Sequence, residues 1–135
     1  MEPAGLLPLT VGVRAGRRTA LLALAVMFSA GIHAALVPEH LAELPRLGDA
    51  FIVAAAVGTV LACALVARPD DPRVRLLAGL FCLGQIAAWA LFVTAAVPGF
   101  AGTPEGVEPI AIVSKVVEAI GILLALPRKE IAWIS

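Results

Sequence analysis

The sequence has little charge and few aromatic residues. Only 15% of its 135 residues are charged, 5% are aromatic, and tyrosine is absent. Soluble domains carry about 25% charged residues, so this shortage disfavours an ordinary soluble fold. The ten basic and ten acidic residues cancel, and no basic block is present that would bind nucleic acid. The remainder is 61% hydrophobic, with a mean hydropathy of +0.99, and predicts a single-domain integral membrane protein whose surroundings are the lipid bilayer.

Motifs of common enzyme chemistry are also missing. The chain has no P-loop, GxGxxG, GxSxG or HExxH pattern, which favours a non-enzymatic protein. The two cysteines, Cys63 and Cys82, do not form a CxxC pair. Both fall in the predicted cytoplasmic halves of hydrophobic runs, where reducing conditions oppose a disulfide, so we interpret them as small buried residues.

Four continuous hydrophobic runs account for most of the chain. They cover residues 19–37, 50–67, 76–97 and 110–126. A membrane-spanning helix needs about 20 apolar residues, within a range of roughly 17–25. The runs lack the alternation of lipid-facing β-strands. Because the connections are short, the sequence predicts an all-α, up-down four-helix transmembrane bundle in one domain, 1–135.

The positive charges are unevenly distributed among the connections. One set of segments carries eight basic residues: Arg14, Arg17, Arg18, Arg68, Arg73, Arg75, Arg128 and Lys129. The opposite loops, 38–49 and 98–109, carry only Arg46 among five acidic residues. The positive-inside rule therefore predicts that both termini are cytoplasmic, in a bacterial inner membrane, with Trp133 as an interfacial anchor.

The first run also has some features of a cleaved signal peptide. Arg17 and Arg18 precede it, and small residues occur near its end. The run is longer than a usual signal core and contains His33, and its removal would upset the alternation of charge. We therefore interpret it as a retained span.

Small residues recur at the four-residue spacing that lets membrane helices approach closely. Examples are Ala54, Gly58 and Ala62 in the second run, Gly121 and Ala125 in the fourth, and Ala30 and Ala34 in the first. We interpret these stripes as contacts within the bundle or between copies of the chain.

Ionisable residues inside the membrane are costly and mark candidate sites. Lys115 and Glu118 are three residues apart, so they share a helix face and can form an ion pair. Counting residues along the runs places Glu118 and Gln85 near the midplane, and Lys115 level with His33. Three interpretations remain open: a self-neutralising pair hydrogen-bonded to Gln85, a lysine that snorkels outward, or a polar site completed by Ser29 and Ser114.

A second group of polar residues surrounds Pro38. His33 lies just before the end of the first run, and Glu39 and His40 follow the proline. Because proline disfavours helix at the preceding residue, we expect the span to end there and a short interfacial helix to follow over 38–44. Two histidines and a carboxylate are a potential transition-metal site, and one histidine is a potential haem ligand. The alternative is that His33 is structural and His40 is solvated.

The stretch from His33 to Phe51 reads His-x4-Pro-Glu-His-Leu-x-Glu-x-Pro-x2-Gly-x2-Phe. It resembles a pattern in an uncharacterised family of small four-span membrane proteins of high-GC, actinobacterial-type bacteria. The resemblance implies the same architecture and points to His33, Glu39 and His40, but it carries no activity.

These observations lead to one main functional expectation. The chain is predicted to be a non-enzymatic accessory subunit or homo-oligomer with an outward-facing polar pocket. The pocket would be lined by His33, Glu39, His40, Gln85, Lys115 and Glu118. The alternatives are a haem- or metal-binding redox protein that uses His33 and His40, and a proton-coupled carrier subunit that uses Glu118.

Overall fold

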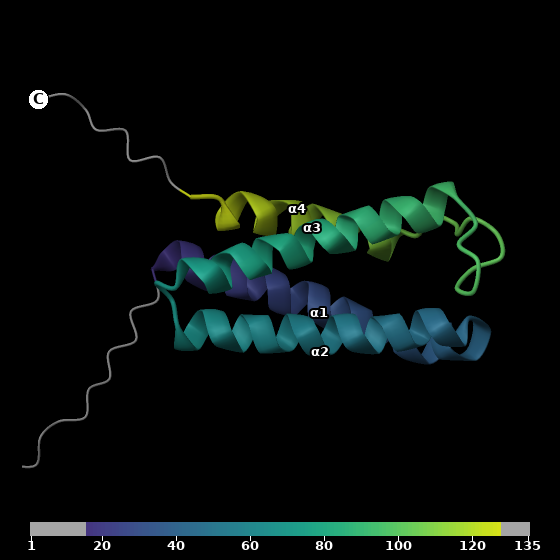
Figure 1. Ribbon diagram of the computed structural model, residues 1–135, viewed down its shortest axis with the longest axis horizontal. Helices are drawn as coiled ribbons and strands as arrows, with labels where there is room; N and C mark the ends of the chain where they lie inside the picture. Colours follow the sequence, from purple (N-terminus) through teal and green to yellow (C-terminus); the bar gives the residue numbers. More distant parts are fainter. Residues whose placement is uncertain (1–15, 128–135) are drawn as a thin grey trace, which may run out of the picture.

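The protein is an all-α bundle of four helices. The computed structural model describes residues 16–127, and the helices are α1 (Arg17–Glu43), α2 (Pro45–Ala67), α3 (Pro72–Thr94) and α4 (Pro109–Ala125). They run in alternating directions, so the start of α1 and the end of α4 lie at the same end of the bundle (Figure 1). We call this the terminal end, and we call the opposite end, with residues 95–108, the loop end. The prediction of four antiparallel helices is confirmed.

Three of the helices are long and apolar enough to cross a membrane. Within residues 16–127 these are α1, α2 and α3, whereas α4 has only 17 residues and does not qualify. Large apolar side chains point outward from all four helices, for example Leu24, Val60, Leu76 and Leu123. This surface suits contact with lipid. The predictions that involve Arg14, Arg128, Lys129 and Trp133 lie outside the described residues.

The helices start earlier than the hydrophobic runs. α2, α3 and α4 each begin at a proline, namely Pro45, Pro72 and Pro109. Proline suits a first helical position because its fixed φ is helical and its missing N–H would be unpaired there. Asp71 adds a cap to α3 by accepting a hydrogen bond of 2.9 Å from the backbone N–H of Arg73. The charged residues near these starts therefore belong to helices, although they lie outside the apolar runs.

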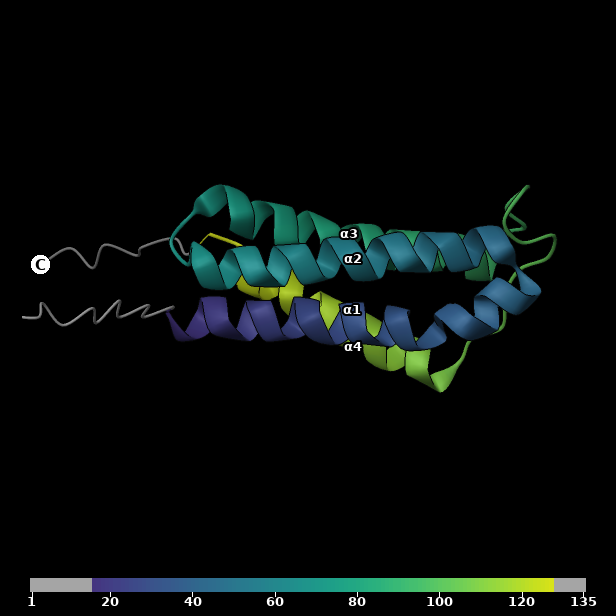
Figure 2. The ribbon, with the colours of Figure 1, turned by 90° about the horizontal axis from the view of Figure 1, so that it is seen from below.

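The prediction that the first helix breaks at Pro38 is wrong. α1 continues through the proline to Glu43, so there is no separate interfacial helix over 38–44. The helix bends near its loop end instead of stopping (Figure 2), as helices do where proline removes one backbone hydrogen bond. Contacts with α2 hold the last turns in place: the ring of His40 packs on Phe51, and Leu41 lies against Gly48. Leu44 alone connects the two helices.

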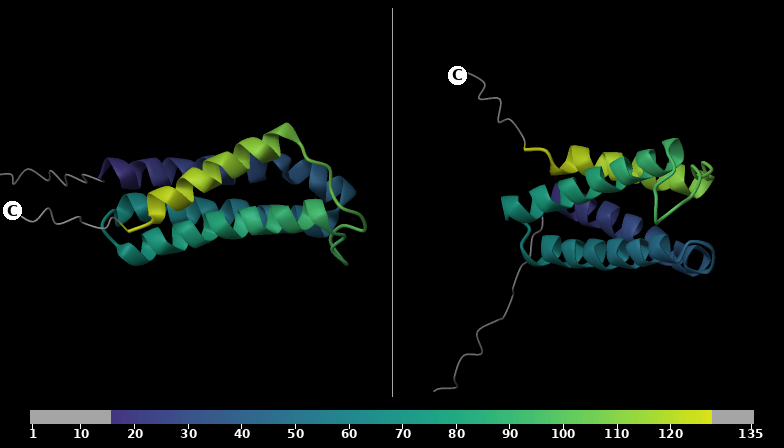
Figure 3. Two further views of the ribbon diagram at one scale, coloured as in Figure 1. Left: turned by 90° about the horizontal axis from the view of Figure 1, so that it is seen from above. Right: turned by 45° about the vertical axis from the view of Figure 1, so that its right-hand side comes forward.

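The helices form a ring, and α1 makes more contact with its neighbours than any other helix does. α1 packs along α2 and α4, while α3 packs mainly on α4 and touches α2 less. α4 crosses the bundle obliquely over α1 and α3 (Figure 3). Close approach depends on small residues: a Cβ added to Gly58 would lie 2.8 Å from the Cβ of Ala30. The predicted stripe of Ala54, Gly58 and Ala62 is buried, which confirms it as a packing surface.

The apolar core fills the half of the bundle near the terminal end. Its members come from α1, α2 and α3: Leu22, Ala23, Val26, Ala62, Leu65, Val74, Ala78 and Cys82. Two arginines form hydrogen bonds with the last carbonyls of α4 at the terminal end. Arg18 donates to the carbonyls of Leu123 and Leu126 at 2.7 and 2.8 Å, and Arg75 donates to Leu124 at 3.0 Å. Guanidinium groups suit this position because the last carbonyls of a helix lack partners. The other half of the bundle contains the cavities, with apolar and polar side chains in their walls.

Candidate functional site

Glu118 is a carboxylate enclosed by the bundle. Its side chain on α4 is fully buried and accepts three hydrogen bonds. Ser29 of α1 donates to Oε1 at 2.6 Å, Ser114 donates to the same oxygen at 2.9 Å, and the ammonium of Lys115 lies 2.7 Å from Oε2. The ion pair that the three-residue spacing allows is present, and Ser29 and Ser114 both contact its carboxylate. A buried charge is tolerated only when it is paired and hydrogen-bonded in this way.

Lys115 turns inward, toward Glu118. Its side chain is 13% exposed, and its Nζ also donates to the backbone carbonyl of Gln85 at 3.3 Å. The snorkelling interpretation is therefore wrong. The predicted link to Gln85 is present, but it uses the backbone and leaves the side-chain amide of Gln85 to line a cavity. Two of the three ammonium hydrogens are engaged by protein acceptors.

His33 and His40 make the same kind of hydrogen bond within α1, each to the backbone carbonyl four residues earlier. The Nδ1 atom of His33 lies 2.8 Å from the carbonyl of Ser29, and that of His40 lies 3.0 Å from the carbonyl of Leu36. A carbonyl only accepts, so each Nδ1 carries a hydrogen, and in the neutral form of the ring Nε2 is the acceptor. His33 is buried as expected, whereas His40 is half-buried and is not a solvated loop residue.

The ring of Phe51 contacts both imidazoles. Its centroid is 5.1 Å from that of His33 in an edge-on arrangement and 4.4 Å from that of His40 in a tilted one. Because α1 continues through Pro38, the seven-residue spacing puts both histidines on the face toward α2. The sequence motif had included Phe51 without assigning it this contact.

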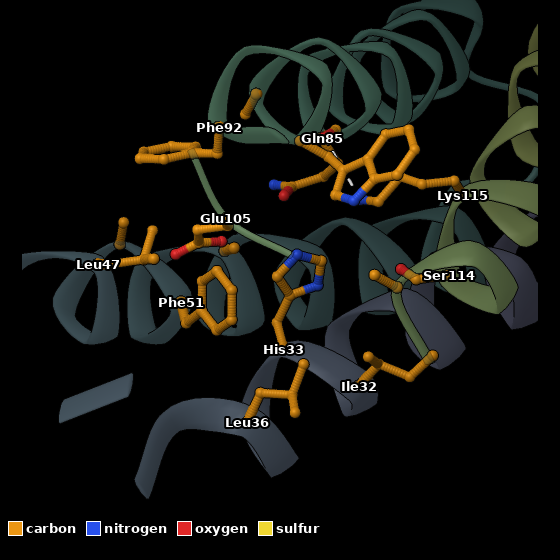
Figure 4. Close-up of a pocket in the computed structure, with 15 residues that line it drawn as sticks. Ile32, His33, Leu36, Leu47, Phe51, Gln85, Phe92, Glu105, Ser114 and Lys115 are labelled. Atoms are coloured by element: carbon orange, nitrogen blue, oxygen red, sulfur yellow. Dashed lines mark hydrogen bonds between the residues drawn. The ribbon is translucent and has the colours of Figure 1, made fainter. Parts of the chain in front are cut away.

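A cavity of about 200 Å³ lies between the helices on the loop side of the ion pair. Its polar wall includes His33, Gln85, Ser114, Lys115 and Glu105 (Figure 4). The rest of the wall is apolar and aromatic: Ile32, Leu36, Leu47, Ala50, Phe51, Ala54, Ala88, Trp89, Phe92 and Ala111. In Figure 4, Lys115 and Glu105 lie at opposite sides of this inner cavity, with His33 between them.

An outer cavity of about 360 Å³ adjoins the inner one at the loop end. The two share Leu36, Phe51, Trp89, Glu105 and Ala111 in their walls. The outer cavity is also lined by Glu39, His40, Glu43 and Glu108, and by no lysine or arginine. Its surroundings are therefore acidic and include part of the 95–108 loop.

The structure distributes the six predicted pocket residues over three levels. His33, Gln85 and Lys115 line the inner cavity, and Glu39 and His40 line the outer one. Glu118 lines neither cavity, but it is hydrogen-bonded to Lys115 and Ser114, which line the inner one. These six residues adjoin one another but do not line a single cavity. That they act together in one functional site stays a prediction.

Glu105 is the residue that sequence reasoning missed. It was counted only as an acidic loop residue, yet it lines both cavities. Its backbone N–H donates to the carbonyl of Phe92 at 2.9 Å, which folds the loop back on the end of α3. Burial raises the pKa of the Glu105 carboxyl above its usual value; His40 opposes this and Glu108 adds to it. No local pattern predicts such a placement, because it depends on how the loop packs.

Trp89 contributes the other unusual group. Its Nε1 is the one buried side-chain nitrogen or oxygen without a hydrogen-bond partner within residues 16–127. The indole lines both cavities, so a free donor lies beside them. Buried donors without partners are rare in proteins and call for a specific explanation.

The histidines do not form a shared metal centre in the described part of the chain. No three His, Cys, Asp or Glu residues between positions 16 and 127 are grouped so that they could hold a metal ion. Both imidazoles instead contact the same phenyl ring. Cys82 is buried against Gly121, as expected, whereas Cys63 is exposed, contrary to expectation.

Comparisons with protein families, with curated proteins and with solved structures found no match to this chain. The functional argument therefore rests on its own residues.

Proposed function

We propose that this chain is a non-enzymatic four-span membrane protein that binds a small molecule in the inner cavity. It would act as an accessory subunit of a larger complex or as a homo-oligomer. One observation carries the proposal: a cavity with His33, Gln85 and Lys115 in its wall lies among helices whose outer surfaces are apolar. Polar groups in the membrane are expensive, so a cavity that collects several of them supports a binding role.

The proposal takes α4 as a fourth span. At about 1.5 Å per residue its 17 residues extend about 25 Å, near the lower limit for a bilayer core of about 30 Å. Exposed apolar side chains follow its length, including Ile112, Val116, Ile120 and Leu123. The hydrogen bonds from Arg18 and Arg75 support a position of its final turn level with the starts of α1 and α3.

The proposed orientation puts the terminal end in the cytoplasm of a bacterial cell, with the cavities facing outward. Arg17, Arg18, Arg68, Arg73 and Arg75 belong to the described residues of the terminal end. The loop end carries Glu39, Glu43, Asp49, Glu105 and Glu108, with Arg46 as its single basic residue among those described. This asymmetry supports cytoplasmic termini and an inner-membrane location. Membership of the high-GC bacterial family, suggested by the His33–Phe51 pattern, is part of the same proposal.

The two alternative functions receive less support from the geometry. A redox centre on His33 and His40 lacks further ligands among residues 16–127. A proton carrier needs a path to Glu118, but this side chain is fully buried and lines neither cavity. Binding in the inner cavity requires neither a metal nor a proton path.

The topology is tested by cysteine labelling in intact cells. The background variant carries Cys63→Ser and Cys82→Ala, and single cysteines are introduced as Thr103→Cys at the loop end or Asp70→Cys at the terminal end. We expect a membrane-impermeant maleimide to label only Thr103→Cys in intact cells. A C-terminal epitope tag should be accessible only after permeabilisation, together with Asp70→Cys. A tag on the same side as Thr103→Cys would show that α4 does not span.

The opening of the cavity is tested by tryptophan fluorescence. The chain has two tryptophans, so Trp133→Phe leaves Trp89 as the single reporter. In proteoliposomes, added acrylamide should quench Trp89. The matched control is Ala87→Trp in a chain without Trp89 and Trp133, because Ala87 is exposed on α3 outside both cavities. Equal, weak quenching of both reporters would contradict an open cavity.

A further inference from the structure

Glu105 is a carboxyl group that no lysine or arginine pairs with in the described part of the chain. Between residues 16 and 127 the one ion pair joins Lys115 to Glu118, and no hydrogen bond to the Glu105 side chain is present. The residue is half-buried and lines both cavities. Removing a carboxylate from water costs free energy unless a cation compensates it. The junction of the cavities therefore holds a carboxyl group that a bound cation could pair with.

Three aromatic residues line the inner cavity together with Glu105. These are Phe51 of α2 and Trp89 and Phe92 of α3. In Figure 4, Glu105 lies near Phe51 and Phe92 and far from Lys115. Aromatic faces attract cations through their quadrupoles, and the attraction is stronger where water is excluded. A carboxylate beside aromatic rings is the combination that favours an organic ammonium group.

The charges around the outer cavity favour cationic ligands over anionic ones. Its wall contains Glu39, Glu43, Glu105 and Glu108 and no basic residue other than His40. Four carboxylates around one cavity raise the local concentration of cations and repel anions. The inner cavity does not reverse this preference, because the ammonium of Lys115 is already paired with Glu118 at 2.7 Å.

We propose that the ligand is a small organic ammonium compound, with its charged group at Glu105 and its apolar part among the aromatic residues of the inner cavity. This inference rests on the proposed binding function and adds the chemical class. An inorganic cation fits less well, because most of the inner wall is apolar and the described residues offer no group of metal ligands. An anion would meet four carboxylates before it reached Lys115.

The test uses benzyltrimethylammonium as the probe, because its charge is permanent and its ring matches the apolar wall. The Trp133→Phe protein is reconstituted in nanodiscs, and the fluorescence of Trp89 is followed during titration. Benzyl alcohol serves as the neutral comparison and benzenesulfonate as the anionic one. We expect a saturable change with the cation, binding weaker by about tenfold or more for the alcohol, and none for the sulfonate.

Two variants locate the charge that is responsible. Glu105→Gln keeps the shape of the side chain and should weaken binding of the cation by about tenfold or more. Asp49→Asn is the control, because Asp49 is exposed at the loop end and lines neither cavity. It should change the dissociation constant less than about threefold, since exposed charges are screened. Circular dichroism and the thermal midpoint check that both variants are folded.

The outcomes separate this inference from the proposed function. Equal binding of the cation and the alcohol, or unchanged affinity in Glu105→Gln, would overturn the ammonium assignment while leaving a ligand site. If acrylamide quenches Trp89 but benzyltrimethylammonium has no effect, the cavity is open and its ligand belongs to another class. If acrylamide does not reach Trp89, the proposed function itself fails.

Discussion

His33 and His40, two turns apart on α1, both pack against the single ring of Phe51 on α2. This contact links the part of α1 before Pro38 to the part after it, and it does so through a neighbouring helix. The bend at the proline is therefore stabilised by tertiary packing. It also positions the wall that the two cavities share, because Phe51 lines both.

Phe51→Ala should destabilise the bundle by about 2–4 kcal/mol, because it removes two aromatic contacts and leaves a void at the α1–α2 corner. The measurement is unfolding in mixed micelles with increasing sodium dodecyl sulfate. Ile52→Ala is the control, since Ile52 is 45% exposed and faces away from the bundle. Similar losses for both variants would argue that the contact with the histidines has no special role.

The Lys115–Glu118 pair should show strong coupling between its two partners. Lys115→Met or Glu118→Gln alone leaves the other charge without its partner in the interior, at an expected cost of about 3–5 kcal/mol. The double variant should recover much of that loss, because no unpaired charge remains. A double-mutant cycle measures the difference, and additive losses would contradict an essential pair.

Ser29→Ala should cost about 1–3 kcal/mol, because the fully buried carboxylate of Glu118 loses one of its three donors. The matched control is Thr59→Ala. Its hydroxyl is exposed and donates at 2.8 Å to the carbonyl of Ala55 in its own helix. Thermal midpoints in detergent should fall for Ser29→Ala and change little for Thr59→Ala.

Two glycine substitutions should have opposite effects. A Cβ on Gly58 would lie 2.8 Å from Ala30 and 3.0 Å from the ring of Phe81, so Gly58→Ala should destabilise by about 1–3 kcal/mol. A Cβ on Gly31 would meet nothing within 4 Å. Gly31→Ala should therefore be neutral or stabilising by up to about 1 kcal/mol, because alanine favours helix more than glycine. Unfolding in mixed micelles compares them.

Binding of benzyltrimethylammonium should weaken as the pH falls through the pKa of Glu105. Burial raises this pKa above the usual glutamate value, so the loss should begin at a higher pH than for an exposed glutamate. The other ionisable groups that line the two cavities are His33, Glu39, His40, Glu43, Glu108 and Lys115. In Glu105→Gln the residual binding should lose this pH dependence. The same raised pKa opposes folding above it, so Glu105→Gln should add stability near neutral pH and none in acid.

Much of the bundle was predictable because lipid leaves few options for the backbone. Long apolar runs without alternation have to be helical, and the short connections make neighbours antiparallel. The continuation of α1 past Pro38 was not predictable in the same way. Local sequence argues for a break there, and the contacts of His40 and Leu41 with α2 override it.

In the candidate site, too, the residues on regular helices were predictable and the loop residue was not. Ser29, Ser114, Lys115 and Glu118 were identified by counting residues, because a regular helix converts sequence position into depth and face. Glu105 lies in an irregular loop, where no periodicity gives a direction. Its place in both cavity walls depends on the hydrogen bond from its backbone to Phe92 and on the packing of residues 95–108.

The apolar core and the two cavities occupy different halves of the bundle. A bundle built in this way separates the residues of its apolar core from those that line the cavities of the proposed ligand site. The loop-end half can therefore diverge to suit another small molecule while the packing of Leu22, Leu65 and Ala78 is kept. Related chains with different ligands would be expected to share their terminal halves and to differ around Glu105.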